Sequence, residues 1–175
     1  MRYLRFTLLP LLLVACTDQE PVAPDVSPLF NAGKGMNKEP ISGLMQSAGV
    51  GTPGGTFTTP SDICHTWDLP VFTYYEGSLE GPVTFLENTH NKWCDYSHLV
   101  CSGPFEGVVT WKGRTGTISG QFTTNCKPDD SQPLGVACDG VTNAFGSGEL
   151  EGVRFHFKWG PGWYPFTYSG TAFSK

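Results

Sequence analysis

Residues 153–159, with the sequence VRFHFKW, decide the fold class of this chain. Apolar or aromatic residues stand at every second position, and Arg154, His156 and Lys158 stand between them. Because successive side chains of a β-strand point to opposite faces, this period of two predicts a half-buried strand rather than a helix. We expect Arg154, His156 and Lys158 to form the solvent-facing side of that strand. The alternative is an inward-facing cationic stripe, which would suit an acidic ligand.

The same alternation recurs along the C-terminal two thirds of the chain. Turn signals separate the alternating segments, as at Lys112-Gly113 and Pro128-Asp129-Asp130. No window has the 3.6-residue period of a long amphipathic helix. The further predicted strands are residues 71–75, 82–87, 105–112, 118–123, 141–145 and 166–172.

Several predicted strands begin or continue with glycine at a similar place. Leu79-Glu80-Gly81, Phe105-Glu106-Gly107 and Leu150-Glu151-Gly152 share one pattern. Glycine inside a strand marks a bend or a close approach of backbones, and a tightly coiled, closed sheet needs both. We therefore predict an all-β fold, a small antiparallel meander β-barrel over residues 57–175. The alternative is a β-sandwich built from the same strands.

These glycine-rich strands carry a resemblance to a known family. Residues 105–111, 116–120, 146–153 and 168–171 together resemble the barrel family related to allene oxide cyclases and dirigent proteins. Bacterial members of that group have a similar Gly-x-Gly-Glu-Leu-x-Gly segment before the penultimate strand. The resemblance covers about residues 80–173 and implies the closed barrel. It brings no catalytic residue with it, because it rests on glycines and strand rhythm.

The N-terminus has the layout of a secretory signal. Arg2 and Arg5 precede a short apolar run that ends at Leu13-Val14-Ala15-Cys16, and the run is too short to span a bilayer. These last four residues match the bacterial lipobox, which implies cleavage after residue 15 and acylation of Cys16. Because Thr17 rather than aspartate follows the cysteine, we expect delivery to the outer membrane of a double-membrane bacterium.

Residues 16–56 have the composition of a tether. Residues 17–55 hold five prolines and seven glycines, with Phe30 as the single aromatic residue. Such a Pro and Gly content is typical of disordered segments, so we expect a lipidated spacer that connects the signal peptide, residues 1–15, to the barrel domain. The net charge of −5 and the lack of a basic cluster argue against nucleic acid as a partner. The expected partner is the membrane, through the acyl chains on Cys16.

Five cysteines remain after Cys16, and disulfides are the default in an oxidising cell envelope. Pairing of nearest neighbours gives Cys94–Cys101 and Cys126–Cys138 and leaves Cys64 over. A bridge from Cys64 to Cys94 or to Cys101 stays open, because spacing does not fix connectivity.

Two groups of residues suggest chemistry without a recognised motif. His90, Cys94, His98 and Cys101 are zinc-type ligands, but their spacing is unusual and oxidised thiols are expected here, so we predict no metal site and no cofactor. Glu80, Glu106 and Glu151 share one position of the glycine pattern and would form a carboxylate pair if they converged at one rim. Solvated strand ends are the simpler interpretation. No catalytic residue is assigned.

Aromatic residues provide the candidate binding site. Trp159, Trp163 and Tyr164 surround a Gly-Pro-Gly segment, and Trp93 and Tyr96 flank Cys94. Such rings either stack on a ligand at the barrel mouth or plug the barrel end. We expect a binding module for a small apolar or aromatic ligand, or for a glycan, without catalytic turnover. The alternatives are a cyclase or isomerase that uses Glu80, Glu106 and His156, and an interaction lipoprotein with a filled barrel.

Overall fold

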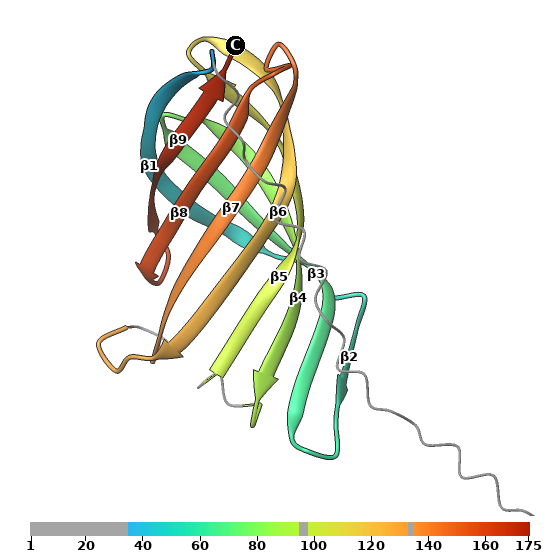
Figure 1. Cartoon of the computed structure of the whole chain (residues 1–175). Coiled ribbons are helices and arrows are strands. Elements are labelled where there is room, and N and C mark those ends of the chain that lie inside the picture. Colours follow the sequence, from blue (N-terminus) through green and yellow to red (C-terminus); the bar gives the residue numbers. More distant parts are fainter. Residues whose placement is uncertain (1–34, 95–97, 133–134) are drawn as a thin grey trace, which may run out of the picture. The chain divides into compact units, whose positions relative to one another are not determined.

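The structure is a computed structural model that describes residues 35–94, 98–132 and 135–175 (Figure 1). In these ranges the chain is all β and contains no helix. The strands are β1 (Asn37–Val50), β2 (Gly55–Thr58), β3 (Ile63–Gly77), β4 (Gly81–Lys92), β5 (His98–Trp111), β6 (Arg114–Pro128), β7 (Val136–Gly148), β8 (Arg154–Gly162) and β9 (Phe166–Ser174).

The strands form one antiparallel sheet that closes on itself. Its order is β1-β9-β8-β7-β6-β5-β4-β3-β2, so that each strand from β3 to β9 lies beside its neighbours in the sequence. An additional pairing of β1 with β3 completes the ring and leaves β2 outside it. The predicted meander barrel is therefore confirmed. A sandwich would need two separate sheets, whereas one continuous ladder runs around this ring.

The predicted boundary at residue 57 is wrong. Strand β1 lies within the segment expected to be a disordered tether, yet it pairs with β9 from Asn37↔Ser174 to Met45↔Phe166. Its other half pairs with β3. Ile41 and Met45 face inward and are buried. The composition of the segment misled because Pro40 lies in the part of β1 that pairs with β9 alone, where a strand tolerates a residue without an N–H donor. The part of the expected tether before residue 35, with Cys16, lies outside the described residues.

Large side chains fill the interior of the ring. The rings of Tyr75, Phe157 and Tyr168 contact one another at centroid distances of 5.3 to 5.8 Å. The Tyr168 hydroxyl accepts a hydrogen bond from the Leu79 amide at 2.9 Å, which joins β9 to the turn between β3 and β4. A ring of this size has room for packed side chains and for little else. The ring interior is thus a packed core.

The inward-facing glycines permit the tight closure. At Gly107 and Gly170 a Cβ atom would contact the backbone of the adjacent strand, at Val83 and Phe157 respectively. Side chains there would push the strands apart, so these positions let the sheet coil closely. This confirms the role expected for glycine inside the strands.

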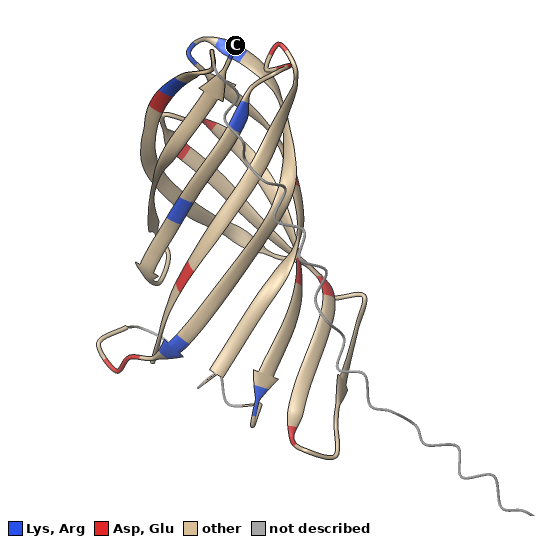
Figure 2. Ribbon diagram, in the orientation of Figure 1, with Lys and Arg blue, Asp and Glu red and all other residues tan. Residues whose placement is uncertain are grey.

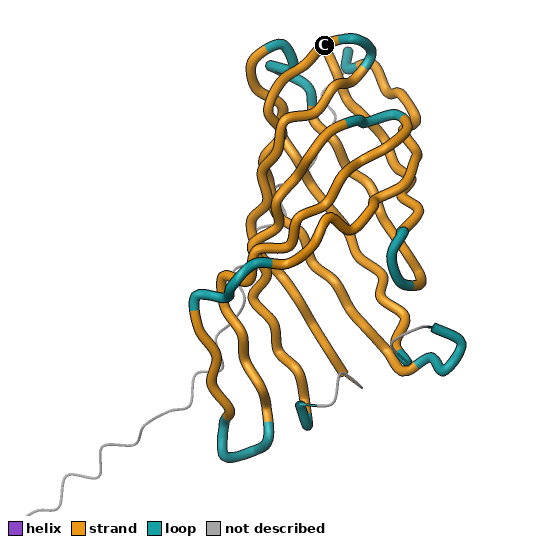
Figure 3. Tube along the Cα trace, turned by 180° about the vertical axis from the view of Figure 1, so that it is seen from behind, coloured by secondary structure: helices purple, strands orange, loops and turns teal. Residues whose placement is uncertain are grey.

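The sheet is much longer on one side of the ring than on the other. Strand β3 pairs with β1 only over residues 71–77, while its first half pairs with β2 and with the end of β4. Figures 1 and 3 show β2 to β7 extending past the ends of β8 and β9. We call this extension the overhang; it comprises β2 and residues 63–69, 87–92, 98–102, 124–128 and 136–138. Its inner face continues the inner face of the barrel.

The outer face of β8 carries polar side chains. Arg154, His156 and Lys158 alternate with the buried Phe155 and Phe157, so the predicted outward orientation is confirmed. Figure 2 shows basic residues scattered over strands and turns of the described chain. Within the described ranges, no helix is long and apolar enough to cross a bilayer.

Candidate functional site

A cavity of about 800 Å³ lies between the overhang and the barrel core. The inner faces of β3 to β7 form its wall, and residues of β8, β9 and the turn between them also line it. Val50 lines the cavity and is 66% exposed, so the cavity opens to solvent there. The cavity lies where the strands differ in length, because β3 to β7 extend past the ends of β8 and β9 (Figure 1).

Aromatic rings form the apolar floor of the cavity. Trp159 and Phe166 are buried, with ring centroids 4.7 Å apart, and the Trp159 indole N–H donates a hydrogen bond to Thr142 Oγ1 at 3.2 Å. The half-buried Tyr164 packs on Phe166 at 4.5 Å, and Trp163 lies beside both. These rings therefore close the packed barrel on one side and line the cavity on the other. The rings thus plug the end of the barrel, which was one of the two alternatives from the sequence, and they also line the cavity.

A group of polar side chains interrupts the apolar wall. On β4, Glu87, Thr89 and Asn91 share the inward face with Val83 and Phe85, and all three line the cavity. The adjacent strands carry the polar row further, because Thr89 pairs with Cys101 and Cys101 pairs with Thr124. We call Glu87, Thr89, Asn91, Cys101 and Thr124 the polar patch.

Burial governs the ionisation of this patch. Removal of the Glu87 carboxyl from water raises its pKa to about 7, although a hydrogen bond from the Cys101 thiol opposes the rise. Burial also raises the pKa of Cys101, and the adjacent Glu87 charge adds to that effect, so the thiol stays protonated and donates. Burial likewise raises the pKa of Tyr164 to about 12. Near neutral pH, Glu87 is thus the one group of the patch that titrates.

Two disulfides border the cavity. The predicted Cys126–Cys138 bond is present and joins directly paired positions of β6 and β7. The predicted Cys94–Cys101 bond is wrong: Cys94 pairs with Cys64, and Cys101 is the free cysteine of the described residues. The reason is sheet geometry. Cys64 on β3 pairs with Asn91 near the end of β4, close to Cys94, whereas Cys101 on β5 pairs with Thr89, further from that end. Proximity along the chain did not predict proximity in space.

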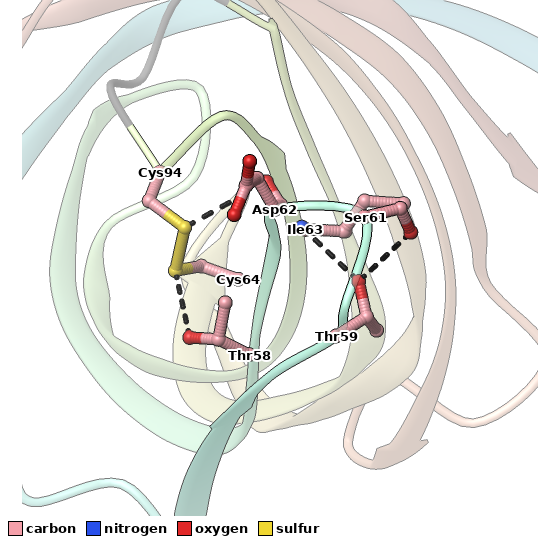
Figure 4. Close-up of a disulfide and its surroundings, with 7 residues drawn as sticks. All are labelled: Thr58, Thr59, Ser61, Asp62, Ile63, Cys64 and Cys94. Carbon is pink, nitrogen blue, oxygen red and sulfur yellow. Dashed lines mark hydrogen bonds between the residues drawn. A yellow bond between two sulfur atoms is a disulfide. The ribbon is translucent and has the colours of Figure 1, made fainter.

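The Cys64–Cys94 disulfide fixes the tip of the overhang. The Thr58 hydroxyl donates a hydrogen bond to Cys64 Sγ (Figure 4), because the disulfide sulfur has no proton of its own. The two atoms are 3.3 Å apart. The amide of Ile63 donates to Thr59 Oγ1 at 3.1 Å and closes the turn between β2 and β3. Close by, the ring of His65 stacks on Phe57 at 4.5 Å and contacts His90 at 4.5 Å, on the face of the sheet that points away from the cavity. Strand β2 and the Cys64–Cys94 disulfide therefore form the tip of the overhang.

The structure separates the other predicted site residues from the cavity. Trp93 is 52% exposed and contacts Lys92 and His98 instead, while Tyr96 lies outside the described residues. Glu80, Glu106 and Glu151 are exposed and do not line the cavity. His156 bonds Asn143 on the outer face, with Nδ1 and Oδ1 2.7 Å apart. The residues considered for a cyclase or isomerase are thus absent from the lining that the structure describes.

The four residues of zinc-ligand type, for which no metal site was predicted, do not come together in the structure. His90 and His98 face outward, whereas Cys101 faces the cavity and Cys94 belongs to a disulfide. Within the described ranges, no group of three or more His, Cys, Asp or Glu residues has the arrangement of a metal site.

Sequence reasoning missed the polar patch, although a signal was present. Val83 and Phe85 fix the inward parity of β4, and the same parity continues through Glu87, Thr89 and Asn91. Polar residues at inward positions of a strand indicate a cavity rather than a packed core.

Neither a scan against protein-family models nor a search of curated proteins gives a match for this chain.

Proposed function

We propose that this protein is a binding module that holds a small, mainly apolar ligand in the cavity beneath the overhang. The observation that carries the proposal is a space of about 800 Å³ with an aromatic floor and one polar patch. Pockets of this size, apolar with a few polar groups, are typical of small-molecule sites. The filled ring beside it gives a rigid floor, so the site is formed before the ligand arrives.

An apolar ligand suits this lining better than a glycan. Trp163 and Tyr164 offer faces for stacking, and Leu69, Val71 and Leu99 extend the apolar surface. A sugar would need hydrogen-bond partners around its whole ring, whereas the polar side chains gather on one part of the wall. A saturable gain in the fluorescence of N-phenyl-1-naphthylamine, a neutral apolar probe, would test binding directly.

Filling the cavity should abolish this binding. Thr89 lies on the inward face of β4, and Thr89→Phe puts a ring into the space that the ligand occupies. We expect at least about a tenfold loss of probe affinity, equivalent to roughly 1.4 kcal/mol, in a fluorescence titration. Thr123→Phe is the matched control, because Thr123 is exposed on the outer face of β6. Equal affinity in Thr89→Phe and the unmodified chain would contradict the assignment of the site.

We further propose that acyl chains on Cys16 anchor this module to the outer membrane of a double-membrane bacterium. The proposal rests on the sequence Leu13-Val14-Ala15-Cys16 and on Thr17. The related proposal of kinship with the allene oxide cyclase and dirigent barrels rests on the glycine pattern and is compatible with the closed meander.

Replacing Cys16 by serine should remove the anchor. Cells that express Cys16→Ser are expected to incorporate no labelled palmitate into the protein, because serine lacks the thiol that is acylated. Cys101→Ser is the control and should keep the label, since Cys101 is buried in the folded domain. Palmitate labelling of Cys16→Ser would disprove the anchor assignment.

A further inference from the structure

The polar patch offers more hydrogen-bond acceptors than donors. Glu87 receives a hydrogen bond from the Cys101 thiol, which is a weak donor, although an ionised carboxylate accepts about four. Thr124 is 4% exposed, and its Oγ1 has no hydrogen-bond partner among the described residues. A buried hydroxyl without a partner is costly unless a ligand or water supplies one. A ligand that donates hydrogen bonds would satisfy both the Glu87 carboxylate and the Thr124 hydroxyl, which can act as an acceptor.

The charge of the lining favours a cation. Glu87 is the single carboxyl on the cavity wall as far as the structure describes it, and that wall contains no lysine or arginine. A carboxylate ligand would lose its hydration and meet a like charge with no cation to compensate. A protonated amine has the opposite charge, and its N–H groups are donors. Charge and hydrogen bonding therefore point to the same head group.

We propose that the cavity selects an apolar ligand with a protonated amine, whose N–H groups bond to the Glu87 carboxylate and the Thr124 hydroxyl while its apolar body lies on the aromatic floor. This inference rests on the proposed binding function and specifies the ligand class of the same site. Cys101 on β5 lies between β4, which carries Glu87 and Thr89, and Thr124 on β6, so both acceptors face the same cavity.

The proposal requires that acid weaken amine binding. The Glu87 pKa of about 7 means that the carboxylate predominates at pH 8.5 and is scarce at pH 5.5. If only the carboxylate form binds the amine, affinity falls about 30-fold across this range. The titratable groups that interact with Glu87 are Cys101 on β5 and Tyr164 in the turn between β8 and β9, whereas His65 of β3 pairs with the outward-facing His90. Glu87→Gln should therefore remove this pH dependence.

The experiment compares three probes with the same ten-carbon body: decylamine, decanol and decanoate. Their affinities for the purified full chain are measured at pH 8.5 by calorimetry below their micelle concentrations. We expect decylamine to bind at least about tenfold more tightly than decanoate, since a charged hydrogen bond contributes roughly a factor of ten or more. Glu87→Gln should lose this preference while binding decanol within about threefold of the unmodified chain.

Two further variants control for folding. Glu106→Gln removes an exposed carboxylate from the outer face of β5 and should leave all three affinities unchanged. Thr124→Val replaces the second acceptor by an isosteric apolar group and should weaken decylamine but not decanol. If Glu87→Gln does not fold, Thr124→Val and the pH profile of the unmodified chain still decide the question.

The outcomes distinguish the two proposals. Equal affinities for the three probes, a preference for decanoate, or an amine preference that survives in Glu87→Gln would overturn the amine selectivity and leave the binding function standing. The absence of binding by all three probes and by N-phenyl-1-naphthylamine would overturn the binding function itself. Amine preference that depends on Glu87 and is lost at low pH supports both.

Discussion

A chain that begins at residue 57 is expected not to fold, whereas a chain that begins at residue 35 should unfold cooperatively in urea. Strand β1 closes the ring, since its residues pair with β9 on one side and with β3 on the other. Without β1, both of those strands become free edges, and the core loses Ile41 and Met45. The combined loss should reach or exceed about 5 kcal/mol, the lower end of the stability of natural domains.

Circular dichroism and urea titration of the two fragments measure this effect. The fragment 35–175 is the matched control, because it lacks residues 1–34 but keeps β1. We expect the fragment 57–175 to aggregate or to lack a cooperative transition, since unpaired edge strands associate with other chains. A cooperative transition of equal midpoint in both fragments would refute the closing role of β1.

Truncation of Phe157 should cause the largest loss of stability from a single side chain. Phe157 is fully buried, at 0% exposure, and its ring contacts both Tyr75 and Tyr168 in the filled ring. Phe157→Ala removes these contacts and leaves a cavity in a rigid barrel that collapses poorly. We expect a decrease of about 3–5 kcal/mol in the free energy of unfolding.

The matched control for this substitution is Phe72→Ala. Phe72 is 42% exposed on the outer face of β3, so its truncation should change the free energy of unfolding by less than about 1 kcal/mol. Urea denaturation of both variants, with the slope compared between them, gives the two values. Similar losses at Phe157 and Phe72 would mean that the ring interior is not the stabilising core.

Local pattern predicted most strands and their orientation. The alternation in residues 153–159 placed Phe155 and Phe157 inside and Arg154 outside, as observed. The Lys112-Gly113 pair was read as a turn, and both residues have positive φ, at 53° and 74°, in the hairpin between β5 and β6. These predictions succeeded because side-chain period and turn chemistry depend on neighbouring residues alone.

The same local reasoning failed where the structure depends on pairing between segments that are distant in the sequence. Strand β1 has the composition of a spacer, and only its partners β9 and β3 make it a strand. Cys94 is closer in sequence to Cys101 than to Cys64, but the register of β3 and β4 brings Cys64 to it. Register is a property of paired strands, so no single segment contains it.

The sequence by itself determined the period of two and correctly predicted the all-β meander, the outward face of β8 and the Cys126–Cys138 bond, although it left a sandwich and other cysteine pairings open. The tertiary structure alone decided that the ring is filled, that the longer strands extend past β8 and β9, and that Glu87, Cys101 and Thr124 meet on one wall. The physical reason is range: alternation and turns are set by adjacent residues, whereas a cavity arises where strands of unequal length, distant in sequence, close around the same space.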